Sequence, residues 1–236
     1  MPLTAPVLVI GGTRGAGLRI VERLVAGDRT VRVLARDPAA ARSRLPGGVE
    51  VVAGDLTRPE TLEPAVRGAA HLVFTAGAPS GRYAPERVVK ATDYDGVLHT
   101  LASLGRTGFT GRFVYLNSMG VTRPSIWAML INLLKRNTLD WRRRAEAAIR
   151  ESGVDYTIIR VGFLTNGPGG KAEIAVTQSP LPLSPRHRIS RQDLARAFAA
   201  ALDHPRASRA TFEITATKGP PGDLDARLAA LQPDCS

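Results

Sequence analysis

The sequence predicts an α/β fold in which a doubly wound parallel sheet carries helices on both faces. Three observations support this prediction. Short β-branched, apolar runs alternate with helical patterns over the first 117 residues. The first run, 7–10, is apolar throughout, as expected of a strand that is buried on both faces. Glycines then separate this run from a helical pattern, as in parallel β-α-β units.

Each element follows from a local pattern. Strands are expected at the β-branched runs 7–10, 31–35, 49–53, 71–75, 113–117, 155–160 and 211–214. Helices are expected where apolar residues recur every three or four positions, at 18–25, 85–104, 139–152 and 193–202. Gly153 ends the third of these helices. Loops are expected at the Pro- and Gly-rich stretches 166–170, 179–185 and 218–222.

We interpret residues 1–236 as a single domain. A chain of 236 residues with 44% hydrophobic residues can bury a sizeable core. The segments 162–190 and 215–236 are predicted to be loops and a tail on the substrate side. Cys235 is the only cysteine in the sequence, which excludes a disulfide framework.

The net charge of +11 raises the question of anionic partners. The basic residues are mostly arginines scattered along the chain, which favours a solvated Arg-rich surface. Direct nucleic-acid binding is the weaker alternative, because no nucleic-acid motif accompanies the basic residues Arg136, Arg142, Arg143 and Arg144. No stretch reaches the ~18–20 apolar residues of a membrane helix. The N-terminus has no secretory pattern, so we expect a cytoplasmic protein without a membrane partner.

A glycine-rich loop, Gly-Gly-Thr-Arg-Gly-Ala-Gly, covers residues 11–17 between the first strand and the first helix. Backbone that approaches a pyrophosphate closely has no room for side chains, and the following helix offers free N–H groups and a positive dipole. This context predicts a dinucleotide site that includes Gly12, Thr13, Arg14, Gly15, Gly17 and Leu18.

The end of the second strand indicates which dinucleotide binds. An NAD site usually has Asp or Glu there for the ribose hydroxyls, whereas this chain has Arg36. Arg36, together with Arg14, suits the 2′-phosphate of NADP(H). Asp37 is expected to cap a helix beside Pro38 instead. After the next two strands, the adenosine half of the cofactor is expected against Asp55, Leu56, Thr75, Ala76 and Gly77.

Taken together, these segments resemble the short-chain dehydrogenase/reductase superfamily, in its atypical, NmrA-like NAD(P)-binding branch. The matching pieces are residues 11–17, 35–38, 54–57, 75–77, 112–121, 145–160 and 189–195. The resemblance implies that residues 1–236 form a single NAD(P)-binding domain, a Rossmann-type sheet with a small C-terminal substrate-binding region. It also implies hydride transfer to a carbonyl, in which a Tyr supplies the proton, a Lys lowers the pKa of that Tyr, and a Ser orients the substrate.

Residue by residue, the resemblance gives an incomplete catalytic set. Ser118 matches the family serine, and the resemblance also places Asn117 at the cofactor. The family's Tyr-x-x-x-Lys positions hold Thr138 and Arg142, so the usual proton-donating pair is absent. Arg142 can still hydrogen-bond the nicotinamide ribose or stabilise an oxyanion. The candidate catalytic residues are therefore Ser118, Arg142, Thr138 and Tyr83, the last from a loop where substrate could enter.

The sequence thus predicts an NADP(H)-dependent ketone or quinone reductase of secondary metabolism. Its substrate would be an apolar carbonyl or polycyclic small molecule. The apolar segment 125–134 would either line the substrate pocket or form a core or subunit-contact helix. Two alternatives remain open: a redox-neutral cyclase, isomerase or epimerase, and a non-catalytic NADP(H)-sensing regulator. We expect no metal and a monomer or homodimer.

Overall fold

The central sheet has the Rossmann strand order. The computed structural model describes residues 5–78 and 84–235. In spatial order the strands are β3 (Glu50–Ala53), β2 (Val31–Ala35), β1 (Val7–Ile10), β4 (His71–Phe74), β5 (Arg112–Ser118), β6 (Asp155–Val161), β10 (Ala210–Thr217) and β8 (Glu173–Thr177). Neighbouring strands are parallel, apart from β8, which runs antiparallel to β10. This arrangement confirms the predicted fold class.

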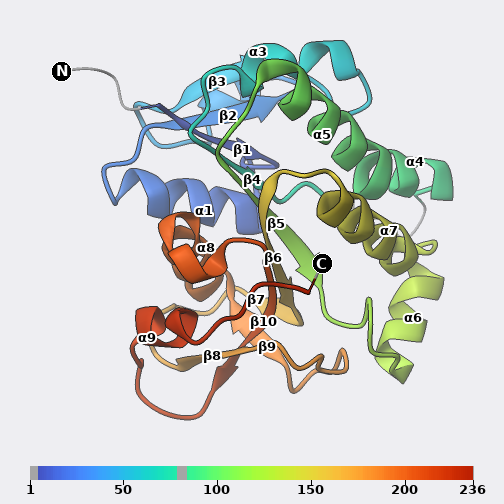
Figure 1. Cartoon of the computed structure of the whole chain (residues 1–236), viewed down its shortest axis with the longest axis vertical. Coiled ribbons are helices and arrows are strands. Elements are labelled where there is room, and N and C mark those ends of the chain that lie inside the picture. The colour runs from blue at the N-terminus through green and yellow to red at the C-terminus, as the bar shows by residue number, and fades with distance from the viewer. Residues whose placement is uncertain (1–4, 79–83, 236) are drawn as a thin grey trace.

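Helices cover both faces of the sheet (Figure 1). On one face, α1 (Gly15–Val25) and α8 (Arg191–Asp203) pack on each other and share one apolar core. On the other face, α3 (Glu63–Val66), α5 (Gly96–Thr107) and α7 (Thr138–Glu151) share a second core. The expected strands and long helices are thereby confirmed, with ends shifted by a few residues.

The helix predicted at 85–104 is interrupted by a π turn. It consists of α4 (Glu86–Lys90), the π segment Ala91–Asp95, and α5. A π turn adds a residue to the helix and is often found at functional sites. Here it directs Asp93 into the interior, where this residue is only 1% exposed.

Several short elements were not predicted. Among the short helices, α2 (Pro38–Arg42) begins at the predicted cap Asp37, whereas α3 and α9 (Leu224–Ala229) were not predicted. The predicted loop segment 162–190 contains three strands, β7 (Phe163–Thr165), β8 and β9 (Arg188–Ser190), so its description as loops was wrong. Strands β7 and β9 pair with each other in a separate parallel sheet. Strands of three residues, such as β7 and β9, are too short to show the two-residue period of a strand in the sequence. The loops at 166–170, 179–185 and 218–222 are confirmed.

A buried ionic network joins α7 to the last strands of the sheet. Arg160 of β6 donates two hydrogen bonds to Glu146 of α7, from Nη2 to Oε2 at 2.6 Å and from Nε to Oε1 at 2.8 Å. Glu213 of β10 lies on the other side of Arg160, with Oε1 3.7 Å from Nη1. The Leu181 N–H donates to Glu213 Oε2. One guanidinium therefore bridges two buried carboxylates.

The Glu213 carboxyl makes stability depend on pH. Burial raises its pKa above the ordinary 4.5, although the Leu181 N–H and Arg160 partly offset this. Between pH 4.5 and the raised pKa, the folded chain keeps a proton that the unfolded chain releases, so stability falls as pH rises through this window. We expect Glu213→Gln to gain stability relative to the wild type over the same window, measured by urea unfolding at a series of pH values. The exposed change Glu151→Gln is the control, and a constant difference between Glu213→Gln and wild type would contradict this account.

Candidate functional site

The predicted site segments meet at the carboxyl edge of the sheet. Ile10, the last residue of β1, pairs with Leu34 of β2 and with Phe74 of β4. The chain that follows each strand therefore emerges at one edge, where ligands of such sheets bind. Thr75 ties two of these segments together, because its N–H and its hydroxyl both donate to the Ile10 carbonyl oxygen, at 2.8 and 3.1 Å.

The glycines of the loop have different physical roles. Gly11 has φ +88°, and a Cβ there would lie 2.6 Å from the backbone N of Ala76, so this neighbour of the predicted glycines is needed for the close approach of two loops. A Cβ on Gly17 would overlap the Gly11 carbonyl oxygen, and one on Gly12 would press on Val21. Gly12 and Gly17 thus bring α1 against the sheet. Gly15, with φ +59°, has open space at its Cβ position.

The start of α1 fits a phosphate group. The Arg14 side chain makes no capping hydrogen bond, and the first turn of α1 holds no acidic residue. The first N–H groups of the helix therefore remain available, and the helix dipole favours an anion. Thr13 and Leu18 flank this turn and are half-buried. Free N–H groups beside an open glycine form a cradle that suits a pyrophosphate.

Two cations stand beside this cradle. Arg14 and Arg36 are exposed, and neither side chain has a hydrogen-bond or ion-pair partner in the described part of the chain. Asp37 does not compete for a ribose, since its carboxylate accepts from the Ala40 N–H at 3.0 Å and caps α2, as predicted. The donor set therefore fits a dinucleotide with an additional phosphate.

The segment after β3 is held by its own side chains. Asp55 Oδ1 accepts hydrogen bonds from both the N–H and the hydroxyl of Thr57, each at 2.9 Å. The Leu56 carbonyl oxygen lies 2.7 Å from His99 Nδ1, and the Leu56 side chain packs on Gly96. Asp55 keeps its second oxygen free of these turn contacts. These contacts fix the loop at the edge where the adenosine half of a dinucleotide is predicted.

Asp93 organises the other half of the site, although sequence reasoning missed it. Its Oδ1 accepts from the Ala78 N–H at 3.0 Å and lies 3.3 Å from Arg142 Nη2. Its Oδ2 accepts the Thr138 hydroxyl. The only sequence signal was an acidic residue inside a predicted amphipathic helix. Asp93 thus joins the loop after β4 to α7, and its contact with Arg142 lies against Gly77, where a Cβ would be 2.7 Å from Nη2.

This network changes the interpretation of Thr138. The residue is 7% exposed, and its hydroxyl proton is directed to Asp93. Thr138 is therefore a partner of Asp93, and a catalytic role for this residue stays a prediction. An aliphatic hydroxyl has a pKa far too high to donate a proton as the family tyrosine does.

Arg142 remains a cation beside the site. Burial lowers its pKa, but the Asp93 charge, the Tyr115 side chain and the hydrogen bond to Asp93 together more than offset this, so the pKa lies above its ordinary value. Its Nη1 also donates to the Leu116 carbonyl oxygen at 3.2 Å. A guanidinium held in this way cannot act as a base, but it can donate hydrogen bonds to a developing negative charge.

Ser118 and Asn117 stand at the carboxyl end of β5 with different surroundings. Ser118 is half-buried, and its hydroxyl donates to the Met119 carbonyl oxygen at 2.9 Å. Asn117 is 1% exposed; its Nδ2 donates to Glu146 at 2.6 Å and its Oδ1 accepts the Ser118 N–H at 2.8 Å. These hydrogen bonds give the Asn117 side chain a structural role at the strand end, and its contact with the cofactor stays a prediction.

A cavity of about 360 Å³ brings these residues together. Ser118, Thr138, Arg142 and Asp93 line it, with Lys135 and Arg191 as further charged groups that sequence reasoning did not single out. Most of the remaining wall is apolar: Ala78, Ala84, Val89, Leu116, Ile131, Leu134, Leu139, Val161, Phe163, Leu164 and Leu183. Such a wall with a few convergent polar groups is typical of small-molecule sites.

Two further expectations from the sequence concern Tyr83 and metal ions. Tyr83 lies outside the described residues. Neither tyrosine nor histidine is among the described residues that line the cavity. The described ranges hold no cluster of His, Cys, Asp and Glu that could bind a metal ion. Within the same ranges, every helix is too short or too polar to cross a membrane.

Comparisons with known proteins agree with this geometry. A family model described as NAD(P)H-binding matches residues 11–205. Sanguinarine reductase of Eschscholzia californica is 30% identical over 218 residues, covering 78% of this chain and 78% of that protein. A Bacillus halodurans structure, provisionally classed as an NAD-dependent epimerase/dehydratase, superposes with a TM-score of 0.79 at 24% identity, over 96% of this chain and 100% of that one. An anaerobillin reductase from Escherichia coli O157:H7 gives 0.74 at 22% identity, over 92% and 100%.

Proposed function

Because residues 11–205 match its model, this chain belongs to the NAD(P)H-binding family, and from that premise we propose that it is an NADP(H)-dependent reductase of apolar carbonyl compounds. The resemblance to the atypical short-chain dehydrogenase/reductase superfamily is confirmed at the level of family and fold. Ketones and quinones with several fused rings are the proposed substrates. Sanguinarine reductase, the plant relative, is named for the reduction of an alkaloid.

The observation that carries the proposal is the position of the cavity. It opens at the carboxyl edge of the sheet, where the glycine loop also begins, and most of the residues that line it are apolar. Ser118 and Arg142 are polar groups on this wall. A carbonyl inside the cavity would meet these groups, while its hydrocarbon frame would lie against Leu116, Leu134 and Phe163.

In the proposed reduction, separate parts of the site would bind the cofactor and the substrate. The start of α1 would hold the pyrophosphate, and Arg14 and Arg36 the additional phosphate. NADPH supplies a hydride when bound. Ser118 would orient the substrate carbonyl, and Arg142 would stabilise the negative charge that develops on its oxygen. Since Thr138 is engaged with Asp93, we assign proton delivery to water or Lys135, which lines the cavity.

A redox-neutral reaction is the second candidate, and one observation favours it. The family's tyrosine position holds a threonine whose hydroxyl is bound to a buried carboxylate, so the usual proton donor is missing. A cyclase, isomerase or epimerase would use the same cavity with no net consumption of NADPH. A non-catalytic NADP(H)-sensing regulator is the third candidate. A role in secondary metabolism and a cytoplasmic location stay predictions.

One experiment separates these candidates. The protein is titrated with NADPH and NADH by nicotinamide fluorescence, and a panel of polycyclic ketones and quinones is then added while absorbance at the nicotinamide band is followed. Consumption of NADPH with one compound is the expected result. We expect Ser118→Ala to lower turnover by about 10–100-fold with unchanged NADPH affinity, because it removes one carbonyl hydrogen bond. Tight binding with no consumption would move the assignment to the redox-neutral or sensing candidates.

The choice of cofactor is tested at Arg36. A charge-assisted pair with phosphate contributes ~1.5–3 kcal/mol, so Arg36→Asp is expected to weaken NADPH binding by about 10–100-fold while NADH binding is retained. The measurement is a fluorescence titration of each nucleotide. The control is Arg42→Asp, which makes the same change in net charge. Arg42 is exposed at the end of α2, and its side chain has no partner in the described part of the chain. Equal loss of NADPH affinity in both variants would leave only a general charge effect.

A further inference from the structure

The outer surface of helix α6 (Ile126–Leu134) is apolar and exposed. The large hydrophobic residues found exposed in the described part of the chain all lie on this helix: Ile126, Trp127, Met129, Leu130, Leu133 and Leu134. We call these six residues the α6 surface. Leu133 is 73% exposed and Ile126 is 72% exposed. A helix that is apolar on nearly every side is normally covered by a protein core or by lipid, so an apolar patch of this kind marks an interaction site.

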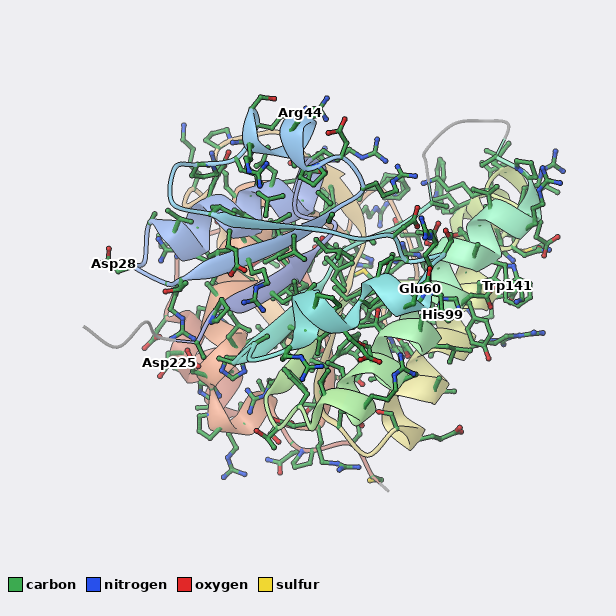
Figure 2. All side chains as sticks on the ribbon, turned by 90° about the horizontal axis from the view of Figure 1, so that it is seen from above. Asp28, Arg44, Glu60, His99, Trp141 and Asp225 are labelled. Carbon is green, nitrogen blue, oxygen red and sulfur yellow. The ribbon has the colours of Figure 1, made fainter. Side chains whose placement is uncertain are left out.

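Exposed basic residues flank the α6 surface along the chain, and the Glu86 carboxylate lies against Asn137 and Trp141 beside it. The segment 119–145 includes five exposed basic residues, Arg123, Lys135, Arg136, Arg143 and Arg144. Asp140 is the one acidic residue of this segment, and it is bound to Asn132 and Arg143. Figure 2 shows Trp141 at the periphery of the molecule, and the Arg144 guanidinium lies 4.7 Å from its ring centroid on the outer side of α7. An apolar helix with cations at its flank complements an anionic, apolar partner.

A second copy of the chain fits this surface poorly. A symmetric dimer through α6 would bring the two sets of cations face to face, and like charges across an interface are costly. A stable interface also takes about 20–30 residues a side. The α6 surface offers six. Both arguments favour a partner that is negatively charged and that accepts a single inserted helix.

We propose that the α6 surface docks this protein on an anionic lipid bilayer, with α6 lying in the interface and the flanking cations on lipid phosphates. Helices of this kind bind by burying apolar side chains among the headgroups, and nearby cations add to the affinity. Trp127 is 42% exposed and packs edge-on against Phe163, a position that suits an aromatic ring at headgroup depth. The sequence excluded a membrane partner because no stretch could span a bilayer, but a helix in the interface needs no span.

The position of the cavity gives this docking a consequence. Ile131, Leu134 and Lys135 line the cavity, so the same helix faces the cavity on one side and lipid on the other. An apolar molecule dissolved in the bilayer could therefore enter the cavity without crossing water. This consequence rests on the proposed function, whereas docking itself does not.

Vesicle flotation of the full chain tests docking directly. The probes are vesicles of phosphatidylcholine alone and vesicles with about one third phosphatidylglycerol. We expect the protein to float with the anionic vesicles, with binding that weakens as salt is raised, and to bind the neutral vesicles much less. Met129→Ser with Leu133→Ser is expected to lower the bound fraction more than about tenfold, because the apolar contribution is lost.

A matched pair of charge variants separates docking from net charge. Lys135→Gln with Arg136→Gln should weaken binding by about fivefold per cation. Arg67→Gln with Arg206→Gln makes the same charge change before the amino ends of β4 and β10, at the opposite edge of the sheet, and should bind as the wild type does. NADPH binding reports folding in every variant. Equal weakening by both pairs, or no flotation with anionic vesicles, would overturn the proposal. Dissociation of a dimer by Leu133→Ser without flotation would instead identify α6 as a contact between copies.

Discussion

Glu146→Ala is expected to lower the free energy of unfolding by about 3–5 kcal/mol, because it leaves a buried guanidinium without its principal partner. Glu146 is 1% exposed, and it accepts two hydrogen bonds from Arg160 and one from the Asn117 side chain. In the described part of the chain, Glu213 is the other carboxylate at ion-pair distance from Arg160, and at 3.7 Å it cannot replace the lost pair. Urea unfolding at neutral pH measures this difference.

The same helix supplies the control. Glu151 lies one turn further along α7, is exposed, and Glu151→Ala is expected to change stability by less than about 0.5 kcal/mol. A loss in Glu146→Ala no larger than in this control would show that the network adds nothing to the fold. Asn117 is bound to Glu146 and directly precedes Ser118, and both Asn117 and Ser118 line the cavity. We therefore also expect Glu146→Ala to disturb the cavity wall.

Arg142→Met is expected to lower turnover of the carbonyl substrate by about 10²–10³-fold, the usual cost of removing a donor to a developing oxyanion. Arg142 lines the cavity, and Asp93 keeps its guanidinium in place and charged. Arg142→Lys is expected to retain turnover to within about tenfold, since an ammonium group in this position can also donate. Steady-state assays at saturating NADPH measure both variants.

Two measurements distinguish an effect of Arg142→Met on catalysis from a loss of structure. Thermal unfolding and NADPH titration show whether Arg142→Met folds and binds the cofactor, which matters because Asp93 is then a buried charge without its cation. Arg143→Met changes the next residue on α7, whose side chain is 60% exposed, and is expected to turn over as the wild type does. Wild-type turnover in Arg142→Met would remove the guanidinium from the mechanism.

The sequence predicted the fold because the fold depends on local signals. Strands buried on both faces are continuous apolar runs, and amphipathic helices show their period directly, so β1 to β6 and the long helices were located to within a few residues. The edge strand β8 and the pair β7–β9 were missed, since these elements are stabilised by distant partners rather than by a pattern of their own.

The sequence by itself also identified the family, the glycine loop after β1, and Arg36 at a position where an acidic residue is usual. These are short segments whose chemistry does not depend on distant parts of the chain. Only the tertiary structure decided that Asp93 holds Thr138 and Arg142, that Asn117 is turned to Glu146, and that α6 is left uncovered. The physical reason is distance along the chain. Asp93 and Thr138 are 45 residues apart, and only the packing of α7 beside the π turn brings a hydroxyl, a guanidinium and a buried carboxylate into contact.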